Sequence, residues 1–114
     1  MKLAIIASPD AEIKYDISKY IHQTNLRHLV LGGEEGIREA VEMWAANNDV
    51  PLIYIVPNYL IDEEDADQIA RSKIANHADE VIYFNTGNSD WDLAFVKAAC
   101  EKKGKPLTVH SFLA

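Results

Sequence analysis

The stretch that decides the fold is Leu29-Val30-Leu31-Gly32-Gly33-Glu34-Glu35-Gly36. An apolar run stops at two glycines and a helical pattern starts directly after them, which predicts a strand, a tight turn and a helix. Glycine adopts positive φ without strain, and a helix start offers unpaired N–H groups together with the positive end of the helix dipole. Such a turn suits a phosphate or a carboxylate, although a tight turn that binds nothing is an equally good interpretation.

Four more short apolar runs accompany this one along the chain, and most of the five are continuously apolar. That pattern is typical of strands buried on both faces, as in a parallel sheet. The five predicted strands are Leu3–Ala7, His28–Leu31, Leu52–Val56, Glu80–Phe84 and Leu107–His110.

Helical patterns fill the gaps, because apolar residues recur there at spacings of three and four. Asp10 is the expected cap of the first helix, and Gly104 is the expected end of the last. The apolar faces are, in chain order, Ile13, Ile17, Tyr20 and Ile21; Ile37, Val41, Trp44 and Ala45; Ala66, Ile69, Ala70, Ile74 and Ala78; and Ala94, Val96, Ala99 and Cys100. The alternation predicts one Rossmann-like, three-layer α/β/α domain over residues 1–114, with a five-stranded parallel sheet of order 3-2-1-4-5.

In such a sheet the ligand crevice lies at the carboxyl ends of the strands, near the switch between strands 1 and 4. Four turns are expected at that edge, namely Ser8–Asp10, Gly32–Gly36, Pro57–Leu60 and Asn85–Ser89. The acidic run Asp62–Asp67 suggests a divalent metal site, but a solvated helix start with Asp62 as its cap is the preferred interpretation, because negative charge is favoured there.

The composition of the chain argues against several classes of function. The chain has 114 residues and a net charge of −7, which argues against nonspecific nucleic-acid binding but not against a small anion in a local pocket. The single cysteine, Cys100, excludes an intramolecular disulfide and a cysteine-based zinc site, and we expect it to be a core residue. No apolar run approaches the roughly 18 residues of a membrane span. The first strand begins too early for a signal peptide, so we expect a cytoplasmic protein.

The order of the elements, taken with several short motifs, resembles the SLOG superfamily, which includes the LOG-type lysine decarboxylase-like proteins and the short YspA-like branch. Similar proteins have a first strand that ends in Ser-Arg-Asp, a Gly-Gly-x-x-Gly turn after strand 2, Arg-Asn in a helix before strand 4, and Ser-x-Gly-Thr and Gly-Lys-Pro around the last helix. The corresponding stretches here are Ser8-Pro9-Asp10, Gly32–Gly36, Arg71-Ser72, Ser89–Asp92 and Gly104-Lys105-Pro106.

The chain also departs from the family pattern. Pro9 replaces an arginine, so an expected anion contact is lost, and Trp91-Asp92 replaces Gly-Thr. The enzymatic LOG branch hydrolyses cytokinin nucleoside monophosphates at the N-glycosidic bond and carries a Pro-Gly-Gly-x-Gly-Thr-x-x-Glu motif, which this sequence lacks. The resemblance therefore implies a nucleotide-like ligand without identifying a catalytic acid.

Twelve residues are candidates for contacting that ligand. They are Ser8, Gly32, Gly33, Glu34, Glu35, Gly36, Arg71, Asn85, Thr86, Gly87, Ser89 and Asp92. Each of the polar candidates has a structural alternative. We expect Ser8 either to contact a phosphate or ribose oxygen or to make a turn hydrogen bond. Glu34 and Glu35 accept ribose hydroxyls or act as a base, or only begin a helix.

Similar pairs of alternatives hold for the later candidates. Arg71 either reaches the crevice as the anion partner or forms a surface ion pair with the acidic helix start, and Asp92 either contacts ligand or caps the last helix. The loop 85–89 binds through backbone N–H groups or simply connects two elements. Trp91 either stacks on a base or packs, and three tyrosines near strand ends are expected to line a pocket: Tyr54, Tyr59 and Tyr83.

These residues lead to one preferred function and two alternatives. The preferred function is binding of a nucleotide or a nucleotide-derived small molecule at Gly32–Gly36, with no cofactor, metal, nucleic acid or membrane as partner. The first alternative is hydrolysis or transfer at a nucleotide N-glycosidic bond, with Glu34, Glu35 or Asp92 as acid. The second is a protein-interaction module whose ligand site has decayed. A homo-oligomer is also expected, with Trp44 or Trp91 as an apolar anchor.

Overall fold

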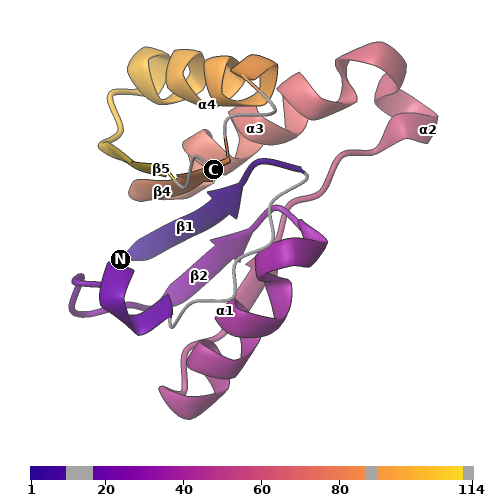
Figure 1. Cartoon of the computed structure of the whole chain (residues 1–114). Coiled ribbons are helices and arrows are strands. Elements are labelled where there is room, and N and C mark those ends of the chain that lie inside the picture. Colours follow the sequence, from indigo (N-terminus) through magenta and orange to yellow (C-terminus); the bar gives the residue numbers. More distant parts are fainter. Residues whose placement is uncertain (10–16, 87–89, 112–114) are drawn as a thin grey trace.

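The computed structural model of the chain describes residues 1–9, 17–86 and 90–111. Its five strands form one sheet in which every pairing is parallel and the order is β3-β2-β1-β4-β5 (Figure 1). The strands are β1 (Lys2–Ala7), β2 (His28–Leu31), β3 (Leu52–Tyr54), β4 (Glu80–Asn85) and β5 (Leu107–Ser111). The predicted Rossmann-like sheet and its 3-2-1-4-5 order are confirmed.

Helices cover both faces of the sheet, which gives the predicted three layers (Figure 1). The α-helices are α1 (Glu35–Asn47), α2 (Tyr59–Asp62), α3 (Ala66–His77) and α4 (Asp90–Lys103), and the 3₁₀ turns are η1 (Ile17–Tyr20) and η2 (Glu63–Asp65). Helix α1 and turn η1 pack on one face, while α3 and α4 pack together on the other.

Strand β1 shows why two separate cores form. Successive side chains of a strand point to opposite faces. Leu3 and Ile5 therefore join the core under α1, whereas Ala4 and Ile6 join the core under α3 and α4. All four side chains are fully buried or nearly so, as expected for the central strand of a parallel sheet.

Strand β3 is shorter than the predicted Leu52–Val56. It lies at the edge of the sheet and has β2 as its one strand neighbour, and β2 ends at Leu31 where the glycine turn begins. The last paired rung is Leu31 with Tyr54, after which one further hydrogen bond runs from the Ile55 N–H to the Leu31 carbonyl at 2.8 Å.

The first predicted helix is described only in its last turn. Asp10 and Ile13 lie outside the described residues, and η1 ends at Tyr20, so Ile21 follows the helix instead of forming part of it. Both Tyr20 and Ile21 nevertheless pack against the core under α1, as the apolar spacing predicted.

Asp62 occupies the predicted N-cap position before Glu63–Asp65, but these residues form a 3₁₀ turn in place of the predicted helix start, and the Asp62 side chain makes no capping bond. Helix α2 starts earlier because the Asn58 side chain accepts a hydrogen bond from the Ile61 N–H at 3.3 Å, and Glu63–Asp65 form turn η2 between α2 and α3. Within the described residues, no group of three or more His, Cys, Asp or Glu side chains is arranged to hold a metal ion.

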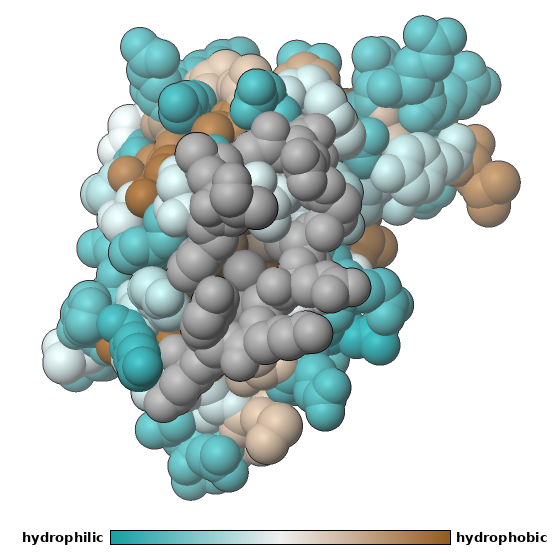
Figure 2. Space-filling model, in the orientation of Figure 1, coloured by the Kyte–Doolittle hydropathy of each residue, from teal (hydrophilic) through white to brown (hydrophobic). Residues whose placement is uncertain are grey.

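Helix α2 projects from the body of the molecule, and hydrophobic side chains gather at its outer end (Figures 1 and 2). Leu60 is 96% exposed and Ile61 is 75% exposed. In the described part of the chain, none of the helices combines the length and apolar character needed to cross a membrane.

Helix α4 ends as predicted at Gly104, which has φ of +66°. The Gly104 N–H donates to the Glu101 carbonyl at 3.2 Å, and the Lys105 N–H donates to the Cys100 carbonyl at 2.9 Å. This pair of bonds is a Schellman motif, which turns the chain into β5. The Cys100 side chain is buried in the core, as expected.

Candidate functional site

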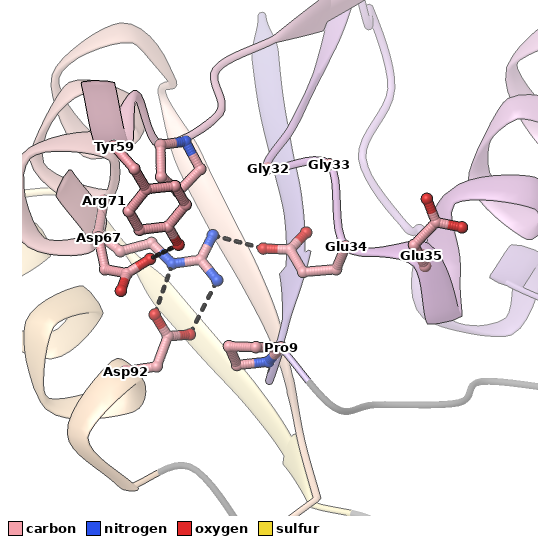
Figure 3. Close-up of a pocket in the computed structure, with 10 residues that line it drawn as sticks. Pro9, Gly32, Gly33, Glu34, Glu35, Tyr59, Asp67, Arg71 and Asp92 are labelled. Atoms are coloured by element: carbon pink, nitrogen blue, oxygen red, sulfur yellow. Dashed lines mark hydrogen bonds and ion pairs between the residues drawn. The ribbon is translucent and has the colours of Figure 1, made fainter. Parts of the chain in front are cut away.

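A hollow of about 230 Å³ opens at the carboxyl ends of β1 and β2 (Figure 3). It lies at the edge where the sheet topology predicts a ligand crevice. Its lining residues come from the ends of β1 and β2, the start of α1, the segment before α2 with the first residue of α2, and helices α3 and α4. They are Pro9, Gly32, Gly33, Glu34, Glu35, Pro57, Tyr59, Asp67, Arg71 and Asp92.

Gly32 and Gly33 are each required in the turn for a different structural reason. Gly33 has φ of +82°, and a Cβ there would lie 2.6 Å from Val56 Cγ1. A Cβ on Gly32 would lie 2.5 Å from Glu34 Oε1 and 2.6 Å from Arg71 Nη1. The space over Gly32 is therefore filled by an ion pair of the protein itself, which accounts for this glycine without any ligand.

Arg71 is the centre of a buried charged network (Figure 3). Its Nη1 lies 2.6 Å from Glu34 Oε1. Its Nε and Nη2 donate to the two carboxylate oxygens of Asp92 at 2.9 and 2.8 Å, which is the bidentate geometry that guanidinium and carboxylate favour. Nη2 also donates to the Ala7 carbonyl at 3.1 Å, so α3, α4, β1 and the start of α1 meet at one side chain.

Tyr83 and Ser8 extend the network beneath the hollow. The Tyr83 hydroxyl donates to Asp92 Oδ2 at 2.7 Å, and the Ser8 hydroxyl accepts from the Thr86 N–H at 3.2 Å. The Ser8 side chain is fully buried and also lies 3.5 Å from the Phe84 carbonyl. Ser8 thus makes the turn-type hydrogen bonds of its structural alternative, and it does not line the hollow.

Burial and charge set the protonation of this network. Burial raises the pKa of the Glu34 carboxyl, and the nearby Arg71 charge only partly opposes that rise. Burial also disfavours the Arg71 charge, but hydrogen bonds to Asp92 and the charge of Glu34 outweigh it and raise the Arg71 pKa. Burial is likewise the main reason that the Tyr83 pKa is raised, so the phenol stays protonated and donates.

One oxygen of this site has no partner. Glu34 Oε1 contacts Arg71, whereas Glu34 Oε2 is buried and accepts no hydrogen bond from the described residues. The Glu34 side chain is only 6% exposed. It is the N-cap residue of α1, yet its side chain makes no capping bond. A buried acceptor without a donor is costly and calls for an explanation, for which a ligand donor is one candidate.

The structure brings together six of the twelve residues predicted to contact a ligand: Gly32, Gly33, Glu34, Glu35, Arg71 and Asp92. Glu35 stands at the rim, where its side chain points away from Arg71 and is 84% exposed (Figure 3). Gly36 lies inside α1, and neither Asn85 nor Thr86 is among the lining residues. Gly87 and Ser89 lie outside the described residues.

Two preferred interpretations from the sequence are wrong. Arg71 does not pair with the acidic run on the surface, because α3 points its side chain inward, where it is 7% exposed and faces Glu34 and Asp92. Asp92 does not cap α4, which begins at Asp90; its carboxylate is held instead by Arg71 and Tyr83.

Of the aromatic residues predicted to contact a ligand, only Tyr59 lines the hollow. The Tyr59 hydroxyl donates to Asp67 Oδ1 at 2.6 Å. Tyr83 is buried, bonds Asp92 and does not line the hollow, and the exposed Tyr54 bonds Glu42 on α1. Trp91 is about half exposed and contacts Phe95 edge to face, so its contact in the structure is packing within α4.

Asp67 is the lining residue that the sequence interpretation missed. The sequence pattern groups it with the acidic run, but it stands four positions before Arg71 in α3, and residues at that spacing share one helix face. That spacing was the available signal. No family model, curated protein or solved structure matches this chain.

Proposed function

We propose that this chain binds a nucleotide or a nucleotide-derived small molecule in the hollow at the carboxyl ends of β1 and β2. The observation that carries the proposal is the buried, unpartnered oxygen of Glu34 at the start of α1. A carboxylate in this position suits a ribose hydroxyl, and crevices at this edge of parallel sheets commonly hold nucleotides. The resemblance to the SLOG superfamily implies the same ligand class and forms part of the proposal.

The size of the hollow fits one portion of such a ligand. At about 230 Å³ it is smaller than the roughly 300 Å³ at which pockets for drug-sized molecules begin. A nucleotide would therefore place one of its groups inside and leave the remainder at the rim, beside Tyr59 and the first turn of α1.

A thermal-shift screen tests the proposal with AMP, ADP, NAD, ADP-ribose, ribose 5-phosphate and cyclic nucleotides. A ligand present at 100 times its Kd stabilises the fold by about 2.7 kcal/mol, which raises the Tm by several degrees. We expect Glu34→Gln to weaken binding about tenfold, which lowers this stabilisation to about 1.4 kcal/mol and roughly halves the shift. Glu39→Gln, which changes an exposed carboxylate of α1 that does not line the hollow, should preserve it. The absence of a shift with every compound would contradict the proposal.

An enzymatic version of this function is the second candidate, because Glu34 combines burial, a raised pKa and a free oxygen. Of the three acids predicted from the sequence, Glu35 is exposed and Asp92 is engaged by Arg71 and Tyr83. We propose Glu34 as the acid for N-glycosidic bond cleavage. Release of free base from a ligand found in the screen, lost in Glu34→Gln, would support it; binding without turnover would exclude it for that ligand.

Self-association and a cytoplasmic location complete the proposal. Trp91 is about half exposed, whereas Trp44 packs partly against the core under α1, so Trp91 is the better of the two predicted anchors. Sedimentation velocity of the wild type and Trp91→Ala would test the oligomer, and cell fractionation would test the location. A monomer at high concentration would contradict the first.

A further inference from the structure

We infer that the ligand presents an uncharged hydroxyl donor, its ribose, to the buried carboxylate of Glu34, and keeps its phosphate outside the hollow. This inference rests on the proposed function and specifies how the ligand is oriented in that site.

The charges that line the hollow disfavour a phosphate. Four acidic residues, Glu34, Glu35, Asp67 and Asp92, line the hollow together with a single basic residue, Arg71. An anion entering this hollow would meet an excess of like charge at short range, which opposes binding. A neutral sugar meets no such repulsion.

Arg71 is also unavailable as a phosphate clamp. Guanidinium recognises phosphate through paired N–H groups. In this protein Nε and Nη2 are directed to Asp92, Nη2 also to the Ala7 carbonyl, and Nη1 to Glu34. To bind a phosphate with two parallel N–H bonds, Arg71 would have to release a buried carboxylate.

Glu34 Oε2 needs a hydrogen-bond donor, which an ionised phosphate does not provide. A carboxylate oxygen accepts hydrogen bonds, and so do the oxygens of an ionised phosphate, so the two cannot satisfy each other. A hydroxyl group donates. This oxygen is buried beside Gly32 and belongs to a side chain that lines the hollow. A small hydroxyl group that enters the hollow can therefore donate a hydrogen bond to it (Figure 3).

Calorimetric titration of the full chain with matched ligands tests this orientation. The ligands are adenosine, guanosine, cytidine and uridine, their 5′-monophosphates, and their 2′,3′-dideoxy analogues. For the base that binds best, we expect the ribonucleoside to bind at least as tightly as its monophosphate. The dideoxy analogue, which lacks the ribose donors, should bind about tenfold or more weakly, since one charge-assisted hydrogen bond is lost.

Variants add an independent readout. In Glu34→Gln the amide oxygen must face Arg71, which only donates, so the NH₂ group replaces the free oxygen and the site loses a charged acceptor. We expect its affinity for the ribonucleoside to fall about tenfold and its selectivity to move towards the monophosphate. Glu39→Gln, which removes an exposed acidic charge of α1 that does not line the hollow, should leave the ratio of the two affinities unchanged.

The outcomes separate this inference from the function on which it rests. A monophosphate that binds tenfold more tightly than its nucleoside, with a dideoxy analogue equal to the nucleoside, would overturn the orientation and leave nucleotide binding intact. If none of these ligands binds, and none from the thermal-shift screen does, both are overturned. The wild-type comparison stands even if Glu34→Gln does not fold.

Discussion

Glu34 links the protonation of the site to the stability of the fold. Because burial raises its folded-state pKa above the ordinary 4.5, the folded protein holds this proton more tightly than the unfolded chain. The free energy of unfolding should therefore fall as pH rises from about 4.5 through the raised value. Relative to Glu34→Gln, the wild type should be most stable at the acid end of that window. Urea unfolding between pH 4 and 8 measures the difference, and parallel curves would show that Glu34 does not titrate abnormally.

Arg71 offers a second test at the level of single residues. Arg71→Met would leave Glu34 and Asp92 as buried carboxylates without a cation, and removal of one partner from a buried ion pair costs about 3–5 kcal/mol. Arg38→Met removes a cation from two solvent-exposed ion pairs, with Glu35 and with Glu42, where about 1 kcal/mol or less is expected. Equal losses of unfolding free energy in the two variants would mean that the Arg71 network is not energetically distinct.

At the level of elements, the end of α4 is the clearest test. Gly104 has φ of +66°, and nothing lies within 4 Å of a Cβ built there, so Gly104→Ala would add backbone strain without a clash. We expect a loss of about 1 kcal/mol. Gly104→Asn should lose less, because asparagine tolerates the left-handed region better. Thermal unfolding of both variants gives the comparison, and an alanine variant as stable as the wild type would exclude strain at this turn.

The elements also show where sequence patterns stop being informative. The continuously apolar runs predicted β1 and β4 well, because central strands are apolar on both faces. Strand β3 was overestimated since its length depends on where β2 ends, and that information lies in another segment of the chain. The start of α2 was missed because Asn58 caps it locally, without an apolar stripe of helical spacing.

At the scale of the whole molecule, the order of the strands can be predicted from the alternation of strands and helices. The arrangement of side chains in the site cannot be predicted in that way. The pattern located the edge at which Gly32, Glu34 and Pro57 gather. It could not show that the side chains of Arg71 and Asp92, on two different helices, turn towards each other, or that Arg71 also reaches the Ala7 carbonyl and the Glu34 carboxylate. That convergence depends on how α3 and α4 pack against each other, and it distinguishes a buried network from a surface ion pair.

The central place of β1 sets an order of events during synthesis. One neighbour, β2, ends at Leu31, but the other, β4, begins only at Glu80. Until the ribosome has released that segment, β1 has an open, apolar edge and one uncovered face, a form that invites mispairing and aggregation. Most of the chain must therefore emerge before its first strand is protected, and a nascent chain stalled after β3 is the species that we expect chaperones to hold.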